Sequence, residues 1–171
     1  SPYLNTVADR SLRCTATILG AGSWGTAFAR YLDSLGHRVR LWEFDPDSAT
    51  RLSTTRQIPD KLPGIRLPTS VEVSHDLDTV VASAEVVVFA TPSTAVRATA
   101  RRLAGLLADP TFLVCLTKGI EVDTGSRMTE IIIGETGLDS VVALLGPSHA
   151  EEVARDIPTA LVAASDDPDA A

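Results

Sequence analysis

Cysteine is scarce in this sequence, and its placement does not suggest a crosslink or a metal site. Cys14 and Cys115 are the only cysteines among 171 residues. Neither belongs to a CxxC motif, and no histidine stands at metal-ligand spacing from either one. We therefore expect two free thiols, buried or partly buried, and no metal ligands.

Long apolar runs and an excess of positive charge are also missing. The longest apolar runs, such as residues 86–90 and 111–116, are strand-sized and far short of the roughly 20 residues that a membrane span requires. The formal net charge of −7 disfavours a general affinity for nucleic acid or anionic membranes, whose phosphates it would repel. We therefore predict no nucleic-acid partner and no membrane insertion, and any phosphate ligand must be held by local groups.

The two ends of the chain carry different signals. Residues 1–14 lack the continuous apolar core of a signal peptide, so we expect a short polar arm and a cytoplasmic protein. Asp167, Pro168 and Asp169 form a typical helix start, with a capping carboxylate, a proline at the first helical position and an acid near the positive end of the dipole. This start favours the N-terminal part of a longer protein, and the alternative is a frayed acidic tail.

Strand-like and helix-like patterns alternate along residues 15–171, which fit one domain. The alternation predicts an α/β fold of the Rossmann type: a doubly wound, mostly parallel sheet with helices on both faces. The expected strands are 15–19, 38–43, 71–74, 85–90, 111–116, 141–145 and 159–164. The expected helices are 24–35, 46–53, 77–83, 93–107, 126–133 and 149–154, and residues 57–68 form an irregular loop rich in proline.

Three glycines interrupt the pattern between the first strand and the first helix. Gly20, Gly22 and Gly25 form GxGxxG within "GAGSWG", in the strand-to-helix context that gives this motif its meaning. The first permits a tight turn, the second lets backbone approach a pyrophosphate, and the third lets the helix pack closely on the strand. The helix N-terminus then offers N–H groups to phosphate, which predicts a dinucleotide-binding domain over residues 15–171.

An acidic residue at the end of the second strand suits the ribose of such a dinucleotide. Glu43 lies eighteen residues after Gly25 and can accept hydrogen bonds from both ribose hydroxyls, whereas it would repel a 2′-phosphate. Phe44 follows it in place of an arginine and could cover the adenine, so NAD is favoured over NADP. Alternatively, Glu43 is a solvated strand end and Phe44 a core residue.

Two further strand ends carry polar turns at the same edge of the sheet. In "ATPST", Pro92 ends a strand and Ser93 can cap the next helix, so this turn flanks the dinucleotide. In "TKGIE", Lys118 projects into the same cleft, where an ammonium can bind a substrate oxygen and polarise a carbonyl. The chain has thirteen arginines and only two lysines, Lys61 and Lys118. The alternative for Lys118 is an ordinary surface lysine.

The stretch "GPSHAEEVA" after the sixth strand is a second candidate for a polar ligand. Glycine, proline and serine at residues 146–148 turn the chain into a helix start with exposed N–H groups. His149 is a possible acid or base, but a capping or solvated role is favoured for a single histidine at a helix start.

Six blocks together resemble the nucleotide-binding domain of NAD(P)-dependent glycerol-3-phosphate dehydrogenase. They are "GAGSWGTA", "GHRVRLWEFD", "KLPGIRLP", "TPS", "TKGIEVDTGSRMTE" and "GPSHAEEVA…PTA", in that order, from Thr15 to the C-terminus. The resemblance implies hydride transfer between NAD(H) and the glycerol 3-phosphate/dihydroxyacetone phosphate pair, in the supply of phospholipid precursors. It implies cofactor contacts for Ser23, Trp24, Phe44 and Ala150, and substrate contacts for Lys118, Gly146 and Ser148.

The same resemblance implies parts that this sequence does not contain. In the family the proton donor is a second lysine in a following helical domain, so we expect the 171-residue chain to bind cofactor with little or no turnover. A homodimer is expected only for the full-length protein. Ile58 and Lys61 stand where the family usually has asparagine and tyrosine, which puts contacts from this loop in question. The "WEF" sequence is closer to the eukaryotic pattern and favours NAD.

Two other functions remain open from the sequence. One is a related 3-hydroxyacid or ketopantoate-type reductase, which shares the fold but should lack the TKGIE and GPSHAEE blocks together. The other is a stand-alone NAD-binding or redox-sensing module, which would bind NAD without depending on a triose phosphate.

Overall fold

The structure is a computed structural model that describes residues 13–108 and 111–167. Most of the predicted N-terminal arm and the helix predicted after Asp167 lie outside the described residues. Cys14 is partly buried and Cys115 buried, both as free thiols, as predicted.

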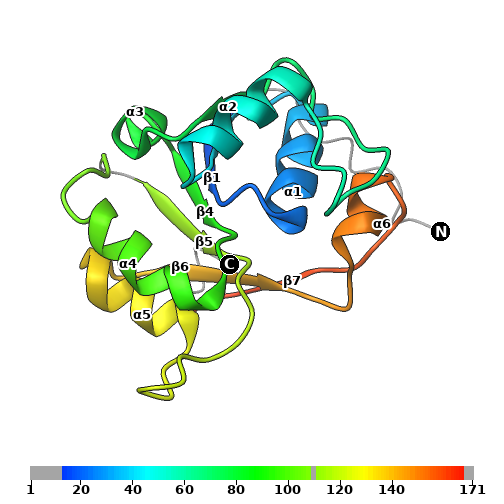
Figure 1. Cartoon of the computed structure of the whole chain (residues 1–171). Helices are drawn as coiled ribbons and strands as arrows, with labels where there is room; N and C mark the ends of the chain where they lie inside the picture. The colour runs from blue at the N-terminus through cyan, green and yellow to red at the C-terminus, as the bar shows by residue number, and fades with distance from the viewer. Residues whose placement is uncertain (1–12, 109–110, 168–171) are drawn as a thin grey trace.

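The described residues form one seven-stranded sheet flanked by helices (Figure 1). The strand order is β3-β2-β1-β4-β5-β6-β7, with every neighbouring pair parallel except β6 and β7. The strands are β1 (Thr15–Leu19), β2 (Arg38–Trp42), β3 (Glu72–Ser74), β4 (Val86–Phe89), β5 (Phe112–Cys115), β6 (Val141–Leu145) and β7 (Val162–Ala164). This confirms the predicted mostly parallel sheet.

Helices cover both faces of the sheet because its central strands are apolar on both sides. The helices are α1 (Ser23–Ser34), α2 (Pro46–Thr55), α3 (Leu77–Val81), α4 (Ser93–Leu103), α5 (Met128–Thr136) and α6 (Ala150–Ala154). Leu19 of β1 joins a buried cluster with side chains of α3, α4 and α5. Its neighbour Ile18 faces the opposite way, into a cluster with Phe28 of α1 and Leu52 of α2.

Two helices differ from the predicted boundaries by more than two residues. The helix expected over 93–107 ends at Leu103, because Ala104 leaves the helical conformation and Gly105 follows with φ +80°. The helix expected over 126–133 begins at Met128 and runs to Thr136, where Gly137 ends it in the left-handed conformation. The predicted cap by Ser93 is wrong: Pro92 is the N-cap of α4, with no side-chain cap hydrogen bond.

The strand order places a crevice between β1 and β4. The chain runs outward from β1 to β2 and β3, then returns to place β4 on the other side of β1. The turns that follow β1 and β4 therefore diverge at the carboxyl edge of the sheet. Ligands of open α/β folds bind at such a switch point.

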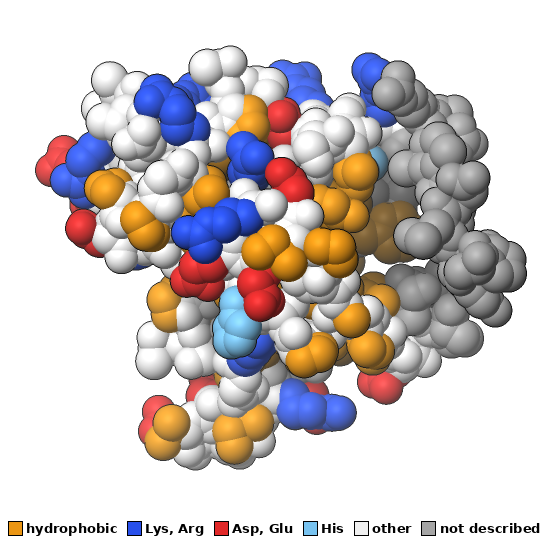
Figure 2. Space-filling model, turned by 90° about the vertical axis from the view of Figure 1, so that its right-hand side faces the viewer, with side chains coloured by type: hydrophobic (Ala, Val, Ile, Leu, Met, Phe, Trp, Pro, Cys, Tyr) orange, Lys and Arg blue, Asp and Glu red, His pale blue; other side chains and the backbone are white. Residues whose placement is uncertain are grey.

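Charged side chains of both signs are interspersed with hydrophobic ones on the described part of the face shown in Figure 2. Among the described helices, none combines the length and the apolar character needed to cross a bilayer.

Candidate functional site

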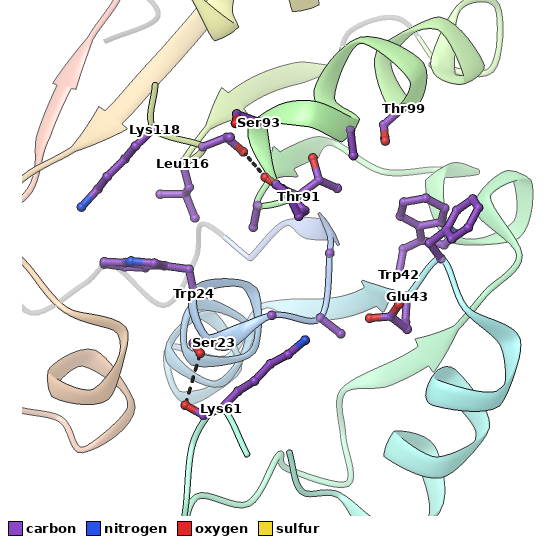
Figure 3. A pocket seen from close by; sticks show the side chains of 18 residues that line it. Ser23, Trp24, Trp42, Glu43, Lys61, Thr91, Ser93, Thr99, Leu116 and Lys118 are labelled. Carbon is purple, nitrogen blue, oxygen red and sulfur yellow. Dashed lines mark hydrogen bonds between the residues drawn. The ribbon is translucent and has the colours of Figure 1, made fainter. Parts of the chain in front are cut away.

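A cavity of about 640 Å³ opens at the carboxyl edge of the sheet (Figure 3). The turn after β1 and the turn after β4 form its middle, as the topology requires. Figure 3 shows Trp42 and Glu43 at one side of it, and Trp24 and Lys118 at the other. The cavity is therefore elongated, and it brings together residues from the ends of four strands.

Two of the three glycines in the first turn are required by packing within the protein. Gly20 has φ +107°, and a Cβ there would lie 2.9 Å from the carbonyl oxygen of Ala90 in the turn after β4. A Cβ on Gly25 would lie 1.8 Å from the carbonyl oxygen of Gly20. These contacts confirm the predicted tight turn and the close packing of α1 on the strand.

Gly22 differs, because no packing contact in the described structure requires its lack of a side chain. Its φ of −75° is accessible to any residue, and a Cβ there would have no atom within 4 Å. It lines the cavity instead. The missing Cβ therefore keeps space open on the ligand side of the turn.

The N-terminus of α1 faces the same space without a side-chain cap. Gly22 is the N-cap residue, no side chain hydrogen-bonds there, and the first turn contains no acidic residue. The first N–H to bond within the helix is that of Thr26, which donates to the carbonyl of Gly22. The N–H groups of residues 23–25 have no partner within the helix, so this end can bind an anion.

Glu43 lines the cavity at the end of β2, and its orientation is fixed. The backbone N–H of Asp45 donates to its Oε1 at 3.1 Å. Beneath it, Trp42 is buried and its Nε1 donates to the carbonyl of His75 at 2.9 Å. Phe44 is 71% exposed and meets the Trp42 ring edge-on, with 6.1 Å between centroids. The alternative that Phe44 is a core residue is therefore wrong.

Lys118 and Trp24 lie together at the opposite side of the cavity. The Lys118 ammonium lies 5.7 Å from the centroid of the Trp24 ring, within the range of a cation–π contact. Gly119 follows with φ +108°, which allows the sharp turn after β5. The hydroxyl of Thr117 donates to the carbonyl of Thr91 at 2.8 Å and joins the exits of β4 and β5 (Figure 3).

An ion network anchors the loop that carries Lys118. Arg97 of α4 donates to both carboxylate oxygens of Glu121, at 2.8 and 2.6 Å, and also pairs with Glu135 of α5. These hydrogen bonds from Arg97, with one from Thr124, lower the pKa of Glu121 to about 2. The loop is therefore attached to both helices on that face of the sheet.

Gly146 and Ser148 border a second cavity that is too narrow to admit a water molecule and that Trp24 and Lys118 also line. Ser148 is only 3% exposed, and its hydroxyl has no hydrogen-bond partner in the structure. Gly146 has a packing requirement that the sequence did not reveal, because a Cβ there would lie 2.3 Å from the carbonyl oxygen of Ala160. The structure thus brings Lys118, Gly146 and Ser148 to one place.

Ala150 and His149 lie apart from this group. Ala150 is buried in a cluster with Ala27 of α1 and Leu62, and it is not among the residues that line either cavity. His149 is the N-cap residue of α6, and its backbone N–H donates to the Glu152 carboxylate at 3.1 Å. The capping position predicted for His149 is confirmed.

Thr91 and Lys61 are among the cavity residues that were not singled out as site residues from the sequence. Thr91 follows β4, and its buried hydroxyl has no partner in the structure. Lys61 comes from the irregular loop, and its carbonyl accepts a hydrogen bond from the Ser23 hydroxyl at 3.2 Å. The turn position of Thr91 in "ATPST" and the rarity of lysine were the available signals. Pro92 lies at the cavity as predicted.

Comparisons with known proteins identify the family of this chain. Residues 15–171 match the family model described as NAD-dependent glycerol-3-phosphate dehydrogenase N-terminus. Glycerol-3-phosphate dehydrogenase [NAD(P)+] of Chlorobium luteolum is 48% identical over 151 residues, which are 86% of this chain and 45% of that protein. The enzyme of the same name from Moorella thermoacetica is 46% identical over 150 residues, or 88% and 44%.

Solved structures lead to the same family. The crystal structure of glycerol-3-phosphate dehydrogenase from Coxiella burnetii has a TM-score of 0.85 at 30% identity, covering 92% of this chain and 48% of that one. The enzyme from Saccharomyces cerevisiae has a TM-score of 0.77 at 25% identity, covering 91% and 48%. The chain spans about half the length of the curated relatives it matches. It belongs to the NAD-dependent glycerol-3-phosphate dehydrogenase family, whose N-terminal part it represents.

Proposed function

We propose that the chain binds NAD along the elongated cavity, with the pyrophosphate at the N-terminus of α1. The observation that carries the proposal is the open space at Gly22, beside a helix end with unpartnered N–H groups and no acidic residue. Packing within the protein accounts for glycine at positions 20 and 25, whereas a ligand in the open space would account for glycine at position 22. A cavity of this size falls within the range of ligand-binding pockets.

We propose that Glu43 holds the adenosine ribose and selects NAD over NADP. Glu43 lines the cavity, and because its Oε1 accepts the Asp45 N–H, its Oε2 retains acceptor capacity for ribose hydroxyls. A 2′-phosphate at this position would meet a carboxylate of like charge. The exposed ring of Phe44 is placed to cover the adenine.

The other end of the cavity then receives the nicotinamide and the substrate. The relatives are named glycerol-3-phosphate dehydrogenases, and we propose the same reaction here, between glycerol 3-phosphate and dihydroxyacetone phosphate. When bound, the nicotinamide supplies or accepts the hydride. Lys118 would hold a substrate oxygen and polarise its carbonyl, with Gly146 and Ser148 beside it as candidate substrate contacts.

Calorimetric titration of NADH and NADPH into the chain tests the cofactor site. We expect NADH to bind much more tightly than NADPH, and Glu43→Ala to weaken NADH binding by about ten-fold, because a charge-assisted hydrogen bond is lost. Asp139→Ala is the matched control: it removes an equal charge just before β6, at the opposite edge of the sheet. Equal binding of NADH to both variants would contradict the role of Glu43. The cytoplasmic location and the homodimer stay predictions.

A further inference from the structure

Both lysines of the chain line the proposed nucleotide cavity, although arginine outnumbers lysine thirteen to two. Lys118 has the substrate role discussed above. From the position of the other, we infer that Lys61 is an affinity-determining contact for the cofactor's pyrophosphate, supplied by the loop between α2 and β3. This inference rests on the proposed binding of NAD.

The backbone at Lys61 is fixed beside the end of α1. Its carbonyl accepts the Ser23 hydroxyl at 3.2 Å, and its N–H donates to the carbonyl of Ile58 at 3.0 Å. The next residue, Leu62, is 1% exposed and packs between α1 and α6 with Ala27. A buried anchor therefore holds an exposed lysine next to the glycine turn.

The Lys61 side chain extends over the cavity. Figure 3 shows it crossing from the loop toward the space in front of the glycine turn, on the side of Glu43. Lys61 also lines the neighbouring cavity of about 440 Å³, again with Glu43. Six arginines form salt bridges within residues 13–108 and 111–167, whereas no salt bridge there involves Lys61.

The N-terminus of α1 does not stabilise this lysine in the absence of an anion. The N-terminus of α1 carries a partial positive charge, and a lysine beside it is repelled rather than stabilised. A pyrophosphate bound at the helix end would make the electrostatic interactions favourable, because both the N–H groups and the ammonium would then face negative charge. The position of Lys61 is thus suited to an anion bound at the helix end.

Calorimetric titration at low and high salt tests Lys61 with two ligands that share the pyrophosphate, NADH and ADP-ribose. For Lys61→Gln we expect both ligands to bind about five-fold more weakly at low salt, the size of an exposed charge pair. High salt should narrow this difference by screening, and Lys61→Arg should retain the affinity. Arg38→Gln is the matched control, because Arg38 begins β2 at the opposite edge of the sheet and its side chain is exposed.

Glu43 provides the second arm of the test, because the alternative is that Lys61 affects binding by pairing with that carboxylate and not by contacting the phosphates. If Lys61 contacts the phosphates, Lys61→Gln should weaken ADP-ribose binding in the Glu43→Ala background by the same factor as in the parent. Three results would each overturn the inference. Lys61→Gln could leave ADP-ribose affinity unchanged in the Glu43→Ala background, its loss of affinity could be the same at low and high salt, or that loss could equal the loss caused by Arg38→Gln. Failure of the parent chain to bind NADH would instead overturn the proposed function, and this inference with it.

Discussion

Replacing Gly22 by alanine should separate nucleotide binding from stability. The backbone there has φ −75°, and the added Cβ would have no atom within 4 Å, so the fold can accept it. Alanine is a poorer N-cap than glycine, but it also restricts the unfolded chain, so the free energy of unfolding should change by less than about 1 kcal/mol. The new methyl group would nevertheless occupy the space proposed for the pyrophosphate.

The effect on binding follows from the hydrogen bonds that the methyl group displaces. A hydrogen bond between a backbone N–H and a charged phosphate contributes about 1.5–3 kcal/mol, so losing one should weaken NADH binding about 10- to 100-fold. Gly25→Ala provides the contrast. Its Cβ would lie 1.8 Å from the Gly20 carbonyl oxygen, so α1 or the turn must shift by about 1 Å, with a loss of about 3 kcal/mol in unfolding free energy.

The two variants are compared by urea unfolding and by NADH titration of the same preparations. We expect Gly22→Ala to unfold with the parent midpoint while binding NADH weakly, and Gly25→Ala to unfold at lower urea. Parent-like NADH affinity in a correctly folded Gly22→Ala chain would refute the reasoning, because the space at Gly22 would then have no part in holding the phosphates.

Three further changes test other parts of the molecule. Glu43→Gln should narrow the preference for NADH over NADPH by about three- to ten-fold, as measured by titration, because a like charge is removed from the position of the 2′-phosphate. Leu62→Ala should lower the free energy of unfolding by about 2–4 kcal/mol in urea, because it leaves a cavity between α1 and α6. Arg97→Ala should lower the Tm at neutral pH. The folded-state pKa of Glu121 is about 2 instead of 4.5, so the stability contributed by its pairing with Arg97 is present above pH 4.5 and is lost toward pH 2. The Tm difference between parent and variant should therefore shrink on acidification, and a constant difference would contradict this assignment.

Most of the sheet could be predicted from the sequence because its strands are short apolar runs between clear turn residues. β1 and β6 span the predicted residues, and the remaining strands fall within the predicted ranges. The antiparallel direction of β7 could not be predicted, because it depends on the path of residues 155–161 after α6 rather than on the strand's own composition. The early end of α4 reflects Gly105, whose left-handed conformation stops a pattern that otherwise continues with Leu106 and Leu107.

The cavity was predictable where a local motif dictates the backbone, as at Gly20 and Gly25. It was less predictable where contacts distant in sequence decide a residue's place. Lys61 lies in an irregular loop, and only the packing of its neighbour Leu62 against α1 and α6 brings it to the turn. Ala150 was expected to contact the cofactor, but the same packing buries it between the helices. Neither outcome is encoded by periodicity or by a short motif.

The charges along the cavity give the proposed ligand a direction. The chain has a net charge of −7, yet both of its lysines line this cavity, together with the positive end of α1. The carboxylate of Glu43 lies at one side of the cavity. The ribose hydroxyls of adenosine can donate to that carboxylate, whereas a carbonyl substrate at the same place would be repelled by it. At the other side, the Lys118 ammonium, which lies over the Trp24 ring, would attract a carbonyl or phosphate oxygen. In the proposed binding mode, the interactions that hold the dinucleotide would therefore also orient it, with the nicotinamide toward Lys118.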